Sequence, residues 1–172
     1  MLEKRKRYIN SLALIIIQIT VITFVMRFFI IEPGSVDGPS MEPTFNDSEI
    51  FLVNKLTYMH SPLRRFDVVQ AVVNGNNGKI DIIKRVVGLP GEIVTVEKGK
   101  IFVETASGEK FPLDEPYLKY GTLTKVRYGA PNKFYISANY YFLVGDNRGQ
   151  SIDSRDTGPV HRKQINGKVI QL

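Results

Sequence analysis

The chain contains no cysteine and only two histidines among its 172 residues. Without cysteine there is no disulfide framework, no thiolate nucleophile and no cysteine-ligated zinc or iron–sulfur site. His60 and His161 are far apart, lack the His-x-x-x-His spacing of a zinc site and lie outside any motif. We therefore expect no metal and no organic cofactor. A Ser-His-Asp triad stays open as an alternative without support of its own.

The chain has little excess of positive charge outside its N-terminus, although its formal net charge is +6. Residues 1–7 hold Lys4, Arg5, Lys6 and Arg7 against Glu3, a net of +3 that makes up half of the excess. The remaining basic residues are mixed with acids, so we expect no nucleic-acid partner. The hydrophobic content of 43% suits one globular domain with an appendage.

A long uncharged run follows the basic cluster. No charged residue occurs from Tyr8 to Met26, and most side chains in this run are bulky and apolar. About twenty such residues span the hydrocarbon core of a bilayer, and a preceding basic cluster stays on the cytoplasmic side. We predict a cytoplasmic N-terminus over 1–7, a transmembrane anchor over 8–31 and an extracytoplasmic domain over 32–172.

The apolar run has two alternative interpretations, a cleaved signal peptide and a buried core helix. A cleaved signal peptide ends in small residues of the Ala-x-Ala kind, whereas this run ends in Phe28-Phe29-Ile30-Ile31. A buried core helix rarely follows four consecutive basic residues. The membrane anchor is therefore favoured, with the lipid bilayer as its partner.

After Pro33 the sequence has the pattern of β-structure, with runs rich in Val, Ile, Phe and Tyr between clusters of Gly, Pro and Asn. We expect a helical turn only near 161–165, and loop with short strands over the proline-broken stretch 105–133. The fold class is therefore mostly β, an antiparallel sheet domain on a single N-terminal transmembrane helix. Strands are expected at 49–53, 68–73, 79–87, 93–96, 101–103 and 140–144.

Ser40 lies in the segment Gly38-Pro39-Ser40-Met41-Glu42-Pro43-Thr44, shortly after the apolar run. Proline and glycine at this density are also typical of an ordinary turn. A serine nucleophile needs a neighbouring base that takes the hydroxyl proton. With no histidine in a motif, lysine is the remaining candidate for that base.

Lys84 lies within a predicted strand, where alternation puts it on the same face as Ile82 and Val86. Burial between apolar neighbours disfavours the ammonium form and lowers the pKa of a lysine. A fall of about 3 from the ordinary value of about 10.4 would make it a base near neutral pH. The alternative is a lysine that extends to solvent from a half-exposed strand.

The third candidate segment is the polar loop from Gly145 to Arg155, directly after the last strong strand. A solvated turn is the default interpretation of such a composition. Its acids and arginines are also able to form ion pairs that hold Ser151 and Asp153 against a buried lysine.

Taken together, these segments resemble the type I signal peptidases, the membrane-bound serine/lysine endopeptidases that remove signal peptides from exported proteins. The resemblance extends from the anchor to about Gly158. The matching segments, in the family's order, are the anchor, Ser40 to Thr44, Arg65-Phe66-Asp67-Val68-Val69, Lys84 to Gly91 and Gly145 to Arg155.

The resemblance implies that Ser40 is the nucleophile and Lys84 the general base. It further implies that Ser151 orients the lysine, and that ion pairs shape the site through Asp146, Asp153 and Arg155. It places the protein in a bacterial cell membrane as a single-pass enzyme with no cofactor and no obligate protein partner. Its substrates would be the signal peptides of exported preproteins.

The oxyanion hole would use the backbone N–H of Ser40. Some family members have a serine two residues before the nucleophile, but this chain has Gly38 there, as in the Gram-positive pattern. We expect a substrate to bind as an added β-strand near Val36 and near Asp81 and Ile83, with shallow pockets that select small side chains.

Three other functions fit parts of this pattern. A non-catalytic relative would act as a membrane-bound assembly or binding factor, yet both residues of the Ser40–Lys84 pair are present. A self-cleaving repressor protease with the same chemistry would have a DNA-binding helix-turn-helix in place of the apolar run. A β adhesion module would leave the apolar-flanked lysine unexplained.

Overall fold

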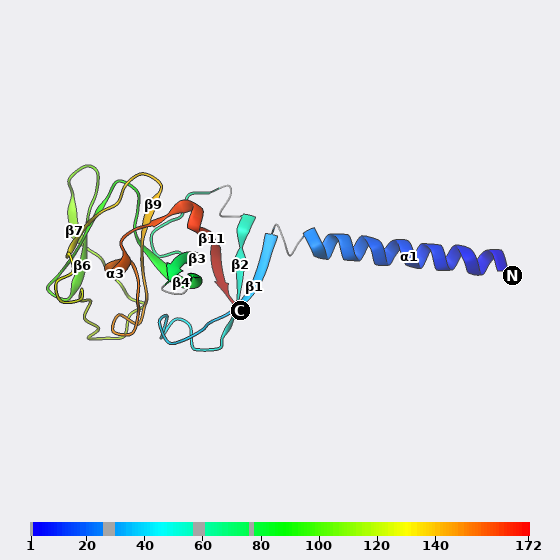
Figure 1. Cartoon of the computed structure of the whole chain (residues 1–172), viewed down its shortest axis with the longest axis horizontal. Helices are drawn as coiled ribbons and strands as arrows, with labels where there is room; N and C mark the ends of the chain where they lie inside the picture. The colour runs from blue at the N-terminus through cyan, green and yellow to red at the C-terminus, as the bar shows by residue number, and fades with distance from the viewer. Residues whose placement is uncertain (1, 26–29, 57–60, 76–77) are drawn as a thin grey trace.

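The computed structural model describes residues 2–25, 30–56, 61–75 and 78–172 (Figure 1). Helix α1 (Leu2–Val25) extends away from a β domain that holds all the described strands. The prediction of a mostly β, antiparallel domain with an N-terminal apolar helix is confirmed.

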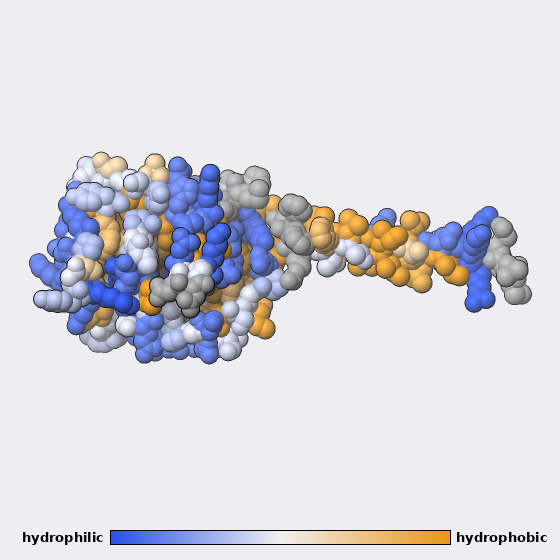
Figure 2. All heavy atoms as spheres, viewed as in Figure 1, coloured by the Kyte–Doolittle hydropathy of each residue, from blue (hydrophilic) through white to orange (hydrophobic). Residues whose placement is uncertain are grey.

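Helix α1 exposes apolar side chains along its length, and hydrophilic residues gather at its N-terminal end (Figure 2). By length and composition, the stretch Lys4–Val25 is apolar enough to cross a membrane, and none of it is buried against the domain. The helix begins within the basic segment, at Leu2, and Ile31 is already the first residue of strand β1 (Ile31–Ser35). Of the sequence-predicted anchor, residues 26–29 lie outside the described part of the chain.

The domain contains two antiparallel sheets (Figure 1). The larger has the order β1-β2-β11-β3-β4-β9-β10, and the smaller, at the end of the domain far from α1, has the order β7-β6-β5-β8. Two short helices, α3 and η2, follow β9. The further elements are β2 (Ile50–Asn54), β3 (Val68–Gly75), β4 (Gly78–Gly88), β5 (Ile93–Glu97), β6 (Lys100–Glu104), β7 (Lys110–Pro112), β8 (Lys133–Tyr135), β9 (Tyr140–Val144), α3 (Ser154–Thr157), β10 (Val160–His161), η2 (Arg162–Gln164) and β11 (Ile165–Gln171).

All six strands that the pattern indicated are present, as β2 to β6 and β9, and η2 lies where a helical turn was expected. The short helix α3 and the strands β1, β10 and β11 were missed, and β11 is the longest of these strands. Its Asn166-Gly167 pair is typical of a turn. In the structure, a Cβ on Gly167 would lie 2.7 Å from the backbone oxygen of Asn54, so the missing side chain is what lets β11 approach β2. Ile165 and Val169 still alternate inward as strand residues.

Buried apolar residues form three clusters. One packs the smaller sheet against β4 and β9, and a second lies around Val69, Val86 and Leu143. The third lies beneath the connection between β1 and β2 and fixes that connection to the sheet. Its members are Val36, Met41, Phe45, Phe51, Val53, Val68 and Val169.

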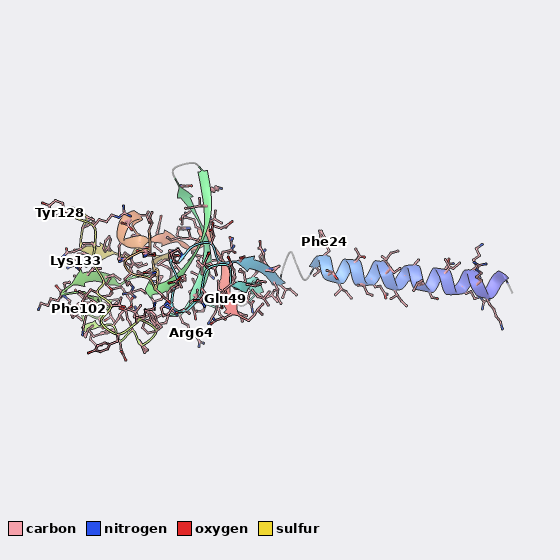
Figure 3. All side chains as sticks on the ribbon, turned by 90° about the horizontal axis from the view of Figure 1, so that it is seen from below. Phe24, Glu49, Arg64, Phe102, Tyr128 and Lys133 are labelled. Carbon is pink, nitrogen blue, oxygen red and sulfur yellow. The ribbon has the colours of Figure 1, made fainter. Side chains whose placement is uncertain are left out.

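Strand β4 has one edge that is only partly used. It pairs with β3 from Gly78 to Arg85, but with β9 only from Arg85 to Gly88. Within the described strands, residues 79–84 of β4 therefore keep an unpaired edge. The β3–β4 hairpin projects from the body of the domain (Figure 3), and this open edge is next to the candidate site.

Candidate active site

Ser40 and Lys84 meet in the folded chain although 44 residues separate them in sequence. Ser40 lies in the connection between β1 and β2, and Lys84 lies on β4. The Nζ of Lys84 is 2.8 Å from the Oγ of Ser40 and also donates to the backbone oxygen of Ile83 at 2.8 Å. This is hydrogen-bond distance for transfer of a proton between hydroxyl and amine.

Lys84 is only 4% exposed. Its pKa is lowered to about 8, chiefly by burial; the carboxylates of Asp153 and Asp146 oppose this shift, and the nearby Arg155 adds to it. The expectation of a buried lysine with a depressed pKa is met by this geometry. Near pH 8, about half of the molecules thus carry the neutral amine that a base requires.

The position of Ser40 is set by its neighbours in the chain. Met41 and Phe45 are buried in the core beneath it, at 0% and 2% exposure. The N–H of Val36 donates to the oxygen of Glu49 at 2.9 Å and closes the base of the connection. The serine side chain is therefore presented from a packed segment.

Gly38 has φ of +83°, a left-handed conformation that side-chain-bearing residues rarely adopt. Its N–H donates to Asp47 Oδ1 at 2.8 Å, and a Cβ there would meet nothing within 4 Å. The N–H of Ser40 donates to no other described residue. Of the two positions named from sequence, only Ser40 has a backbone N–H left to bind an oxyanion.

Asp146 anchors the polar loop to β4. Arg85 donates to both of its carboxylate oxygens, from Nε at 2.9 Å and from NH2 at 2.5 Å, and Thr44 donates its hydroxyl to Oδ2 at 2.5 Å. The next residue, Asn147, donates its N–H to the backbone oxygen of Ser40 at 3.1 Å. Asp146 therefore ties the Ser40 segment to the strand that carries the lysine.

Asp153 and Arg155 form a second buried ion pair, with both carboxylate oxygens of Asp153 accepting hydrogen bonds of 2.8 Å. Burial by itself would raise the pKa of Asp153, but Arg155 and the N–H of Gly145 lower it below its ordinary value. Arg155 also donates to the backbone oxygen of Arg148. The pair thus fixes the shape of the loop and keeps a carboxylate near Lys84.

Ser151 lies in the same loop, and its buried hydroxyl is near enough to Asp153 to help lower the pKa of that carboxyl, although within the described residues it forms no hydrogen bond of ordinary geometry. Lys84 donates to Ser40 and Ile83, and no hydrogen bond joins it to Ser151. A Cβ on Gly145 would lie 2.2 Å from the Ser151 Oγ, so this hydroxyl packs over the glycine. The orienting role of Ser151 stays a prediction.

A cavity of about 440 Å³ opens beside the pair, lined by Ser40 and Lys84 together with Val36, Asp81 and Ile83. All three residues that were expected to contact a substrate therefore border the same space. Strands β1 and β4 form its opposite sides, and β2 and β3 supply the residues between them. The other lining residues are Gly34, Ser35, Asp37, Met41, Phe51, Gln70, Ile80 and Ile82.

A network of buried charged side chains was not expected from the sequence. The guanidinium of Arg85 lies 4.0 Å from the ring centre of Tyr117, whose hydroxyl donates to Glu115 at 2.6 Å. Glu115 also accepts two hydrogen bonds from Arg148. Burial and then Glu115 raise the pKa of Tyr117. The sequence signal that was missed is the spacing of Glu115 and Tyr117, which stand two residues apart in the polar stretch 105–133.

The one histidine in the described part of the chain, His161, lies away from Ser40 and has a capping role. His161 caps η2, where its Nδ1 accepts a hydrogen bond from the N–H of Lys163, and its ring lies against Tyr140. His60 lies outside the described residues. The described ranges also contain no cluster of His, Cys, Asp or Glu suited to a metal ion.

We expect Gly145→Ala to destabilise the domain. A Cβ at this position would lie 2.2 Å from Ser151 Oγ and 2.6 Å from the backbone oxygen of Ser40, so the loop must shift. The free energy of unfolding should fall by about 1–3 kcal/mol in a urea titration. Gly149→Ala is the matched control, because a Cβ there meets nothing within 4 Å. Equal stability of the two variants would contradict the close approach.

A serine hydroxyl beside a buried amine, next to an open strand edge, is the arrangement expected of a hydrolase that acts on peptides. Comparison with known proteins agrees that the protein is a peptidase. The sequence profile of the family described as "Signal peptidase, peptidase S26" matches residues 9–172, and the chain belongs to this family.

Curated relatives match over most of their own length. The chain is 37% identical to signal peptidase I of Bacillus caldolyticus over 84% of this chain and 80% of the relative. It is 35% identical to signal peptidase I P of Bacillus subtilis subsp. natto, covering 96% and 89%, and 35% identical to signal peptidase IB of Staphylococcus aureus, covering 87% and 81%. The crystal structure of a signal peptidase I from Enterococcus faecalis V583 shares the fold, with a TM-score of 0.50 and 23% identity over 64% of this chain and 98% of that one.

Proposed function

We propose that the protein is a membrane-anchored signal peptidase that cleaves N-terminal signal peptides from exported preproteins, with Ser40 as nucleophile and Lys84 as general base. The observation that carries this proposal is the 2.8 Å contact between the Ser40 hydroxyl and a buried lysine with a lowered pKa. The names of the curated relatives support the same substrate class.

In the first half of the reaction, neutral Lys84 accepts the hydroxyl proton while Ser40 Oγ attacks the scissile carbonyl. The resulting oxyanion accepts a hydrogen bond from the Ser40 N–H. The ammonium of Lys84 then protonates the leaving amine, the peptide bond breaks, and the signal peptide remains as an ester on Ser40.

In the second half, a water molecule gives a proton to the again neutral Lys84 and attacks the ester. When the second tetrahedral intermediate collapses, the proton returns to Ser40 Oγ and the signal peptide leaves as a carboxylic acid. Asp146, Asp153 and Arg155 hold the loop, the lysine strand and the Ser40 segment in register through these steps. No metal enters the scheme.

The substrate would bind as an extended strand along residues 79–84 of β4. Backbone groups on an unpaired edge are available to a peptide, which gains affinity from main-chain hydrogen bonds. Val36 and Ile83 both line the cavity beside Ser40. We expect these branched side chains to favour a small substrate side chain next to them.

Helix α1 would hold the enzyme in the bilayer. Its apolar face is unburied in the domain, and its N-terminal basic residues favour the cytoplasmic side. The β domain would then lie on the outer face, where signal peptides emerge. A non-catalytic binding factor is disfavoured, because such a protein would have no use for a desolvated lysine against a serine.

The proposal is tested with the full chain in detergent and a secretory preprotein that has alanine at the first and third positions before the cleavage site. We expect release of the mature protein, identified by its mass. A matched preprotein with phenylalanine directly before the site should react roughly 10-fold to 200-fold more slowly. Failure to cleave either preprotein, or equal rates for both, would contradict the proposed function.

A further inference from the structure

A second cavity, of about 430 Å³, lies next to Ser40 and is distinct from the one bordered by Val36 and Ile83. The two cavities share Asp37, Ser40, Ile80 and Ile82. Ser40 is therefore at their junction. The residues that line only the second cavity are Gly38, Pro39, Val73, Asn74, Gly75, Leu143, Gln150, Ile152, Asp153, Ser154, Thr157 and Val160.

The second cavity has an apolar floor and rim. Leu143 and Val160 are buried core residues, at 1% and 5% exposure, and they form the floor. Ile80 and Ile152 are 49% and 65% exposed and stand at the rim. Apolar side chains that remain exposed around a hollow are typical of a binding surface.

The ionisable side chains that line this cavity, among the described residues, are all acidic. Asp37 and Asp153 are its only ionisable lining residues in the described part of the chain, and neither lysine nor arginine lines it. Asp153 is already paired with Arg155, whereas Asp37 is exposed. An acidic side chain in this space would meet a carboxylate and no cation.

A peptide whose scissile carbonyl lies at Ser40 Oγ must extend from it in two directions. The first cavity runs along the open edge of β4, which suits the extended residues before the scissile bond. The chain after the scissile bond then leaves on the other side of Ser40, where the second cavity begins. Because the two cavities meet at Ser40, the residues before the scissile bond are assigned to the first cavity and the residues after it to the second.

We propose that the second cavity binds the first residues of the mature protein, on the C-terminal side of the scissile bond, and selects against acidic side chains there. This inference rests on the proposed function. The enzyme then selects its substrates by residues on both sides of the cleavage site, and it prefers apolar or neutral residues after the bond. Ile152 is a specificity-determining residue of this cavity.

The test uses the full chain in detergent and pairs of peptides. The two peptides of a pair differ at one of the first three positions after the scissile bond, where one has glutamate and the other has lysine. For Ile152→Arg we expect the ratio of kcat/KM for glutamate over lysine to rise on the order of tenfold at one position, because the new charge attracts one and repels the other. Selection before the scissile bond should not change. Ile170→Arg is the control, since Ile170 is 45% exposed and lines neither cavity.

Ile152→Ala provides a second measurement if the arginine variant cleaves nothing. It should lose about threefold in kcat/KM for a peptide with leucine at the responsive position and none for one with serine, because less apolar surface is buried. An unchanged glutamate-to-lysine ratio in Ile152→Arg, or an equal change in Ile170→Arg, would overturn the inference while wild-type cleavage still upheld the proposed function. If wild type fails to cleave the preprotein, the proposed function itself is wrong.

Discussion

The Ser40→Ala variant should lose preprotein cleavage by at least about 10⁴-fold in kcat while keeping the wild-type fold. The substitution removes only the hydroxyl that attacks the carbonyl. The segment stays in place because Met41 and Phe45 remain buried and the Asn147 N–H still reaches the Ser40 backbone oxygen. Initial rates on the alanine-containing preprotein measure the loss, and a thermal melt measures the fold.

A serine outside the site provides the matched control. Ser107 is exposed in the turn between β6 and β7, and its hydroxyl shares a hydrogen bond of 2.7 Å with that of Thr105. Ser107→Ala should therefore cleave at the wild-type rate. A Ser40→Ala enzyme that releases mature protein as fast as wild type would show that Ser40 is not the nucleophile.

Lys84→Met should also reduce kcat by on the order of 10⁴-fold, since the variant keeps an unbranched side chain as far as Cε and removes the amine that acts as the base. In the wild type, kcat/KM should rise as pH increases through about 8, because only the deprotonated amine accepts the Ser40 proton. Below that pH, the rate should fall about tenfold per pH unit. Values of kcat/KM for one peptide from pH 6 to pH 10 measure this rise. A kcat/KM that does not change over this range would show that Lys84 is not the general base.

The same lysine should make the stability of the domain depend on pH. Its pKa is about 8 in the folded state against the ordinary value of 10.5, so the unfolded chain binds more protons between these values. The free energy of unfolding should therefore rise with pH across the window from about 8 to about 10.5. A difference of about 2.5 between the two pKa values corresponds to about 3 kcal/mol.

Urea titrations of wild type and Lys84→Met at pH 7.5 and pH 10.5 isolate this contribution. The wild type should gain about 3 kcal/mol relative to the variant between the two conditions. Contributions from all other titrating groups cancel in the comparison. Parallel pH dependences of the two proteins would mean that the lysine is not desolvated in the folded state.

Much of the fold was predictable because its signals are local. The uncharged run and the alternating β-branched strands are patterns of neighbouring residues, and they lead to α1 and to β2 through β6 and β9. Strand β11 was missed because Asn166-Gly167 is usually a turn. Its strand conformation depends on close packing against Asn54, which no local pattern contains.

The candidate site likewise contains residues that local motifs indicated and residues that no local motif indicated. Ser40, Lys84, Asp146 and the pair of Asp153 with Arg155 stand in short dense motifs, and the structure brings these motifs together. The network of Glu115, Tyr117 and Arg148 with Arg85 carries no such motif, because each member is an ordinary polar residue until burial pairs it.

By itself, the sequence determined the apolar helix, the antiparallel β class and the residue types available for chemistry, since composition and periodicity depend only on neighbours along the chain. Only the tertiary structure decided that a lysine 44 residues away touches Ser40. It also decided that this lysine is desolvated, that Ser151 packs over Gly145 and forms no hydrogen bond with the lysine, and that Ser40 joins two cavities. Distance, burial and the shape of empty space arise from contacts between remote segments, and those contacts exist only once the chain has folded.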